Sequence, residues 1–199
     1  MPKRPIARGN RSRRNLISPP TAVFLVGFMG VGKTTVGRIM SEKLGWQFVD
    51  LDEMIERRNR RPVAQIFRDS GEPAFRRLEH AALRTLISHV RSGKPVIAAL
   101  GGGAMAQARN RSLLRRHKFP VIFLDAPVPT LRRRCLLQAR KTGADRPLLG
   151  TMEEFLVRYS ARAKFYRQAS MRISTHARRP SVIAAQLIHD LGLAEFLSN

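Results

Sequence analysis

The chain has 199 residues, of which 43% are hydrophobic, and it carries a formal net charge of +23. This length and composition suit a domain with a full hydrophobic core and exclude a generally disordered protein. No apolar run approaches the roughly 18 residues that a membrane-spanning helix needs, and the basic start of the sequence does not resemble a secretory signal. The single cysteine, Cys135, excludes an internal disulfide and a cysteine-based metal cluster, so we expect a cytoplasmic location.

The positive charge has two interpretations, because a basic protein can bind either nucleic acid or an anionic small molecule. Most of the charge comes from arginines scattered along the chain, and no recognisable RNA- or DNA-binding motif accompanies them. We therefore expect no specific nucleic-acid partner. Residues 1–20 contain six Lys or Arg, no acid and a terminal Pro pair. Such a segment cannot bury a core, so we expect a disordered basic tail before one domain that covers residues 21–199.

Short apolar segments alternate with helical patterns along the rest of the chain. The predicted strands cover residues 22–26, 47–49, 96–100, 121–124 and 171–173. The first predicted helix ends at Gly45, and the last is expected from Ser181 to about Phe196. This alternation predicts an α/β fold of three layers, in which helices cover both faces of a central parallel sheet of about five strands.

A phosphate-binding loop is predicted at Gly27–Thr34, which matches the pattern G-x-x-x-x-G-K-[ST] between an apolar strand and an amphipathic helix. The glycines let backbone N–H groups turn toward phosphate oxygens at the positive end of the helix dipole. Lys33 is expected to reach the β- and γ-phosphates of a nucleoside triphosphate, and the Thr34 hydroxyl is expected to bind Mg²⁺. The expected nucleotide contacts from this segment are Gly30, Val31, Gly32, Lys33, Thr34 and Thr35.

Two aspartates follow the second predicted strand, at the edge of the sheet where ligands bind in α/β proteins. Alternation along an extended segment would place the side chains of Asp50 and Asp52 on one side. We expect Asp50 to hold Mg²⁺ through water, and Asp52 to bind an acceptor hydroxyl and help remove its proton. The alternative is that one of them only caps the helix that follows.

Three glycines, Gly101–Gly103, follow the third predicted strand, where many phosphate-loop proteins have a metal-binding Asp. Glycine there allows close approach of a ligand to the backbone, although a plain flexible turn would look the same. The motif Gly71-Glu72-x-x-Phe75-Arg76-x-x-Glu79 is expected to open a long helix. Glu79 can orient Arg76 for bidentate recognition of a carboxylate, although the pair could equally be a surface ion pair.

Taken together, these motifs resemble the shikimate kinases. The resemblance extends from residue 21 to about residue 192 and rests on motifs in the order and approximate spacing of that family. They are the phosphate loop, Asp50-x-Asp52, Gly71-Glu72-x-x-Phe75-Arg76-x-x-Glu79, Gly101-Gly102-Gly103, Arg146-Pro147-Leu148-Leu149 and Arg162-x-x-x-Tyr166. The resemblance implies a P-loop kinase fold and Mg-ATP-dependent phosphorylation of the 3-hydroxyl of shikimate.

The resemblance also implies roles for single residues. Asp52 would bind the ring hydroxyls and accept the proton, while Arg76, Gly102 and Arg162 would bind the remainder of shikimate. Arg146 would act catalytically on the phosphates from a mobile lid over residues 138–150, and Arg178 would lie beside the adenine. The family often has Pro where this chain has Lys164, and Arg158 lies one turn before Arg162. The carboxylate partner could therefore be shared between these two arginines.

Two other functions remain open at this point. One is another small-metabolite kinase, such as a gluconate kinase, because two arginines and an Asp pair also suit that polyhydroxy acid. The other is a kinase-like module that senses ligands without turnover. The predicted partners are ATP and shikimate, with Mg²⁺ as cofactor, no membrane and a monomeric state.

Overall fold

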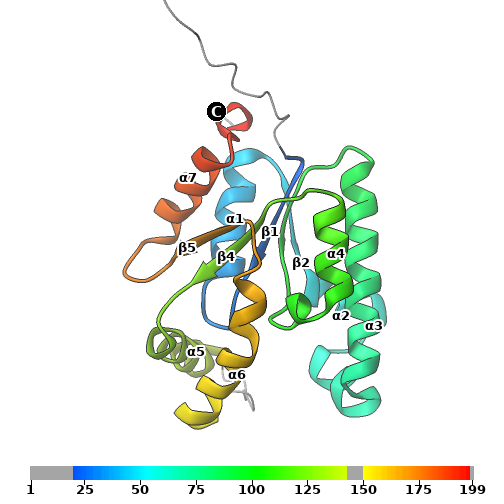
Figure 1. Cartoon of the computed structure of the whole chain (residues 1–199), viewed down its shortest axis with the longest axis vertical. Coiled ribbons are helices and arrows are strands. Elements are labelled where there is room, and N and C mark those ends of the chain that lie inside the picture. The colour runs from blue at the N-terminus through cyan, green and yellow to red at the C-terminus, as the bar shows by residue number, and fades with distance from the viewer. Residues whose placement is uncertain (1–19, 143–149, 198–199) are drawn as a thin grey trace, which may run out of the picture.

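A computed structural model describes residues 20–142 and 150–197, and its centre is one five-stranded sheet (Figure 1). The strands lie in the order β2-β3-β1-β4-β5, and every neighbouring pair is parallel. Their bounds are β1 (Ala22–Val26), β2 (Gln47–Asp50), β3 (Val96–Ala99), β4 (Val121–Asp125) and β5 (Met171–Ser174). All five predicted strands are confirmed to within one residue at each end.

Strand β1 occupies the middle of the sheet because all five of its side chains are apolar and buried. Leu25 pairs with Ala99 of β3 on one side and with Ile122 of β4 on the other. The connection from β3 to β4 therefore passes from one side of β1 to the other. In sheets of this kind ligands bind beyond the carboxyl ends of the strands, at the position where the winding changes direction. The loops after β1 and β3 meet at that position.

Helices cover both faces of the sheet, so the predicted three-layer α/β fold is confirmed. Figure 1 shows α1 and α7 together on one side of the strands and α3 with α4 on the other. The helices are α1 (Lys33–Leu44), α2 (Leu51–Asn59), α3 (Val63–Arg91), α4 (Ala108–Arg116), α5 (Val128–Thr142), α6 (Met152–Tyr166) and α7 (Pro180–Asp190), with 3₁₀ turns η1 (Ala104–Ala106) and η2 (Ala194–Phe196). Within the residues described, none of these helices is long and apolar enough to cross a membrane.

Glycines explain where two helices end. Helix α1 ends at Gly45 as predicted, with Gly45 in the left-handed conformation at φ 64°. The prediction that the last helix reaches about Phe196 is wrong, because α7 ends at Asp190. Gly192 has φ 67°, and the N–H of the next residue, Leu193, bonds back to the carbonyl of Ile188. This arrangement is typical of a left-handed helix terminus, and η2 is a separate turn.

Helix α3 has a kink at Gly71, where the backbone has the non-helical angles φ 75° and ψ 171°. The expectation that the long helix opens at Gly71 holds for its second segment only, since a first segment starts already at Val63. Pro73 lies in the first turn after the kink, where its missing N–H costs no helical hydrogen bond. The kink therefore begins a new helical turn just before Arg76 and Glu79, at the ligand-binding edge of the sheet.

Candidate functional site

The predicted phosphate loop connects β1 to α1 and packs tightly against neighbouring backbone. Gly27 has φ 144°, and a side chain there would collide with the carbonyl oxygen of Leu124. Gly30 has φ 76°, and a Cβ there would lie 2.6 Å from the carbonyl oxygen of Leu131. Gly32 precedes α1, and no side chain caps this helix or places an acid in its first turn. The helix N-terminus is thus available to an anion.

Lys33 lies across this loop. Its Nζ donates hydrogen bonds to the carbonyl oxygens of Gly27, at 2.9 Å, and Phe28, at 3.4 Å. Burial lowers the pKa of Lys33, whereas the carboxylates of Asp52 and Asp50 act in the opposite direction. Lys33 therefore lies between the loop and two acids, where its amino group could reach phosphate oxygens.

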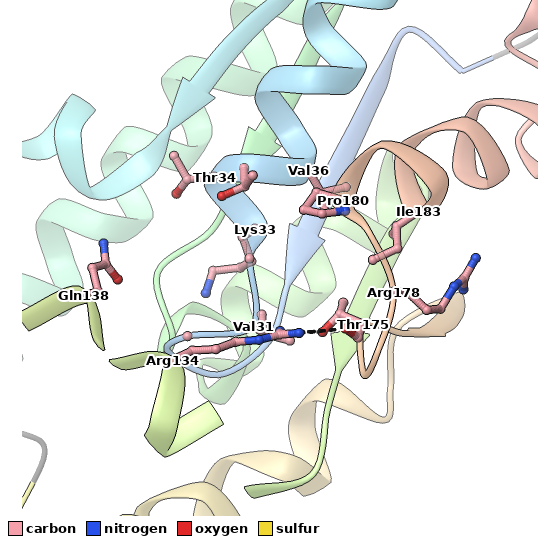
Figure 2. A pocket seen from close by; sticks show the side chains of 13 residues that line it. Val31, Lys33, Thr34, Val36, Arg134, Gln138, Thr175, Arg178, Pro180 and Ile183 are labelled. Carbon is pink, nitrogen blue, oxygen red and sulfur yellow. Dashed lines mark hydrogen bonds between the residues drawn. The ribbon is translucent and has the colours of Figure 1, made fainter. Parts of the chain in front are cut away.

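A cavity of about 470 Å³ opens beside the loop (Figure 2). This volume falls in the range that small-molecule sites occupy. Its lining residues are Gly30, Val31, Gly32, Lys33, Thr34, Thr35, Val36, Arg134, Gln138, Thr175, Arg178, Pro180 and Ile183. The structure therefore brings together all the predicted nucleotide contacts except Arg146, which lies outside the described residues. Residues 143–149 of the expected lid and residues 1–19 of the expected tail also lie outside the described residues. The catalytic role of Arg146, the lid and the disordered tail therefore stay predictions.

Arg134 of α5 lines the cavity and was not foreseen from the sequence. Its Nη1 donates to Thr175 Oγ1 at 3.0 Å and its Nη2 to the Thr175 carbonyl at 2.8 Å, a contact marked in Figure 2. Arg178 lies beyond Thr175 and donates to Gln186 at 2.7 Å. In the sequence Arg134 is the last of three consecutive arginines. Only the helical phase of α5, which the buried residues Leu131 and Cys135 mark, could have singled it out.

Asp50 connects the phosphate loop with helix α2. Its Oδ2 accepts a hydrogen bond from the Thr34 hydroxyl at 3.1 Å, and its Oδ1 accepts one from the Asp52 N–H at 3.1 Å. The second bond makes Asp50 the N-cap of α2. Asp50 therefore caps the helix, as the alternative interpretation has it, and also contacts Thr34. The extended geometry expected between the two aspartates is wrong, because α2 begins at Leu51 and its first turn places Asp52 near the loop.

These residues suit Mg²⁺. The Thr34 hydroxyl donates a hydrogen bond to Asp50, so the lone pairs of the hydroxyl oxygen are left for a cation. Hydroxyl and carboxylate oxygens are ligands that Mg²⁺ prefers, usually with substrate phosphates and water. In the part of the chain that the structure describes, no three His, Cys, Asp or Glu side chains form a metal cluster. Thr34 and Asp50 thus offer two oxygen groups, to which nucleotide phosphates and water would add the remaining ligands.

The triple glycine is the place where the predicted acceptor-binding residues meet. A Cβ on Gly101 would lie 2.6 Å from Asp52 Oδ1, and a Cβ on Gly102 would lie 3.1 Å from Arg162 Nη1. A Cβ on Gly103 would collide with the guanidinium of Arg76. Each glycine thus makes room for one of three predicted site residues, Asp52, Arg162 and Arg76, although these come from three different helices. The interpretation as a plain flexible turn does not account for this arrangement.

Asp52 and Glu79 both have an unusual environment at this point. Asp52 Oδ1 and Glu79 Oε1 are buried, and neither has a hydrogen-bond partner among the described residues. Burial raises the pKa of Asp52 to about 6, with further increases from Asp50 and Glu79, against which Lys33 acts. Burial also raises the pKa of Glu79, opposed by Arg76. Carboxylates with raised pKa in a cleft are candidates for proton transfer.

The two predicted arginines are held by different means. Arg76 is 17% exposed and forms ion pairs with Glu79 at 2.9 Å and with Glu72 at 2.7 Å. Arg162 lies 5.7 Å from the ring centre of Phe28, which belongs to the phosphate loop. Arg158, the alternative to Arg162, lies 3.9 Å from Glu154. Of these two, it is Arg162 that approaches the glycine run.

Comparisons with known proteins point to one family. The family model for shikimate kinase matches residues 29–192. The shikimate kinase of Persephonella marina is 37% identical over 167 residues, which cover 83% of this chain and 96% of the relative. A shikimate kinase of Thermus thermophilus is 38% identical over 185 residues, which cover 90% of this chain and 95% of the relative.

Solved structures show the same relationship. Shikimate kinase from Acinetobacter baumannii, in complex with shikimate, superimposes with a TM-score of 0.75 at 31% identity, covering 90% of this chain and 97% of the other. A gluconokinase from Sinorhizobium meliloti has a TM-score of 0.56 at 18% identity, a likeness of fold alone. Since the family model spans most of the chain and the relatives match along nearly their full length, the chain belongs to the shikimate kinase family.

Proposed function

We propose that this protein transfers the γ-phosphoryl group of ATP to the 3-hydroxyl of shikimate. The observation that carries the proposal is the convergence of Asp52, Arg76 and Arg162 on the glycine run beside the phosphate loop. An acceptor that fits there has hydroxyls for a carboxylate and a carboxylate for two guanidinium groups. Shikimate has both, and the named relatives support this choice.

Asp52 is proposed to accept the proton of the attacking hydroxyl. Because its pKa is raised to about 6, it is ionised at neutral pH and is still a stronger base than an ordinary Asp. Its Oδ1 has no protein partner among the described residues, so a substrate hydroxyl could take that position. Arg76 and Arg162 would bind the substrate carboxylate and fix the ring so that one hydroxyl faces Asp52.

The cavity beside the loop is proposed to hold ATP. Lys33 and the N-terminus of α1 would bind its phosphates, while Arg134, Arg178 and Pro180, which also line the cavity, would contact the adenine. Thr34 would contact Mg²⁺ directly and Asp50 would do so through water. When bound, this ion neutralises negative charge on the β- and γ-phosphates. We expect the protein to act in the cytoplasm as a monomer.

Release of ADP from Mg-ATP tests the proposal directly, with shikimate, gluconate and no acceptor compared in parallel. We expect ADP release to depend on shikimate and to yield shikimate 3-phosphate. Equal or faster release with gluconate would refute the choice of acceptor. ATP binding without any acceptor-dependent turnover would instead favour a ligand-sensing module.

A second arm of this experiment uses Asp52→Asn. We expect this variant to bind ATP normally and to lose phosphoryl transfer, because an amide cannot accept the proton at neutral pH. Near-normal turnover would show that Asp52 is not the proton acceptor, even if shikimate is the substrate.

A further inference from the structure

Gln107 lies directly before helix α4 and contacts a buried acid of the site. Its Nε2 donates a hydrogen bond to Glu79 Oε2 at 2.5 Å. The same Glu79 oxygen accepts a bond from Arg76 Nη1 at 2.9 Å. Glu79 itself is fully buried, with 0% exposure. One buried carboxylate oxygen is therefore shared between Gln107 and the arginine that faces Gly103.

The other end of the Gln107 amide is also occupied. Its Oε1 accepts a bond from Arg109 Nε at 2.8 Å, and Arg109 Nη2 donates to the carbonyl oxygen of Arg76 at 2.6 Å. These contacts form a closed circuit from Arg76 through Glu79, Gln107 and Arg109 back to the Arg76 backbone. Both ends of the amide are thus fixed, so the side chain has one orientation in which all bonds are satisfied.

Gln107 occupies the N-cap position of α4, but its side chain does not cap that helix. Residues favoured at this position usually bond to the helix that they precede. The backbone N–H of Gln107 instead bonds to Ala104 in the 3₁₀ turn, and Ala104 bonds back to Gly101. A short, hydrogen-bonded stretch of four residues therefore connects the glycine run to the amide that contacts Glu79.

From this geometry we infer that Gln107 is a positioning residue for carboxylate binding. It holds Glu79 in the orientation that directs Arg76 toward the glycine run, and it fixes α3 against the segment that carries Gly102. The inference rests on the proposed function, since it assigns Arg76 to the substrate carboxylate.

The choice of a neutral donor has a physical reason. The charge of Glu79 contributes to the raised pKa of Asp52, and the charge of Arg162 acts to lower the pKa of Glu79. A cation at position 107 would compete with Arg76 for the Glu79 charge, whereas an amide stabilises the ionised carboxylate and leaves its charge to Arg76. The Glu72 pair cannot replace this support, because the Glu72 side chain is 62% exposed and its ion pair is screened by water.

The test uses Gln107→Met, which keeps the length of the side chain but cannot donate a hydrogen bond. We expect the KM for shikimate to rise about 3- to 10-fold, with kcat and the KM for ATP within about 2-fold of the unmodified protein. Gln168→Met is the matched control, because Gln168 is an exposed glutamine after α6, away from the site. An unchanged KM for shikimate in Gln107→Met would overturn the inference.

Two further measurements separate positioning from a general loss of structure. In an Arg76→Ala background, Gln107→Met should raise the KM no further, because its effect acts through Arg76. A full additional rise would contradict the circuit. Gln107→Glu, a more polar variant of the same size, should raise the KM more than Met does, since it places a second carboxylate against Glu79. If Gln107→Met fails to fold, an unaltered KM in Gln107→Glu would still refute the inference.

The outcome is distinguishable from failure of the proposed function. If the unmodified protein does not phosphorylate shikimate, the proposed function falls. If it does so and the Gln107 variants keep the same KM, only the positioning role is wrong.

Discussion

Replacing Asp52 by Asn should make the unliganded protein more stable while it removes activity. Asp52 has a buried oxygen without a hydrogen-bond partner among the described residues, and its carboxyl faces the carboxyl groups of Asp50 and Glu79. Ionising an acid in such a place costs free energy of folding. The amide of Asn has nearly the same shape and carries no charge, so it removes that cost.

The magnitude follows from the pKa of Asp52, which burial raises from 3.8 to about 6. Because the folded protein binds this proton more tightly than the unfolded chain does, folding becomes less favourable as pH rises from about 4 to above 6. At about 1.36 kcal/mol per pKa unit, the cost is about 1 kcal/mol at pH 4.5 and about 3 kcal/mol at pH 8. Asp52→Asn should therefore be the more stable protein by about these amounts.

Urea unfolding of the unliganded proteins at both pH values measures this difference. At pH 8 the thermal midpoint of Asp52→Asn should also be higher, by about 6 to 12 °C for a chain of this size. Glu42→Gln on α1 is the control, since Glu42 is exposed and should change stability by less than about 0.5 kcal/mol. A stability gain that is absent at pH 8, or equal at the two pH values, would refute the argument from charge burial.

Other substitutions address the two halves of the site separately. Arg76→Ala should raise the KM for shikimate at least about 10-fold, because a charge-assisted contact contributes about 1.5–3 kcal/mol; an unchanged KM would exclude Arg76 from carboxylate binding. Arg134→Ala should raise the KM for ATP and leave that for shikimate within about 2-fold, since Arg134 lines the cavity proposed for ATP; steady-state kinetics with each substrate varied would reveal the reverse pattern. Removal of residues 1–20 should leave kcat unchanged if the catalytic domain is 21–199 as we propose, and a large loss of kcat would place the tail in the site.

The strands could be predicted from the sequence because each is a short apolar run that carries its own signal. Strand β1 is buried along its whole length, and the phosphate loop that follows matches a pattern whose glycines each have a geometric reason. The convergence of Asp52, Arg76 and Arg162 was predictable only through the family resemblance. Their segments are separated by long stretches of chain, and periodicity does not say which helix ends meet.

Other features could not be predicted because they depend on tertiary contacts. The local N-cap signal does not say which of the two aspartates begins helix α2, so an extended segment between Asp50 and Asp52 fits the sequence equally well. Arg134 lies among neighbouring arginines, and beyond the helical phase of α5 it is the contact with Thr175 that distinguishes it. Gln107 has no motif at all, since its importance comes from a carboxylate 28 residues earlier in the chain.

The glycine run after β3 leaves space for the charged side chains around it. None of the three glycines has a Cβ, and an added methyl group would meet a different side chain at each position, so the three alanine variants should differ in their effects. Alanine at Gly101 would displace Asp52, at Gly102 it would press on Arg162, and at Gly103 it would displace Arg76. The contact at Gly102 is the loosest, at 3.1 Å, and should be the most tolerant. The absence of a side chain at these three positions is thus as necessary to the proposed acceptor site as the three charged groups that occupy the space.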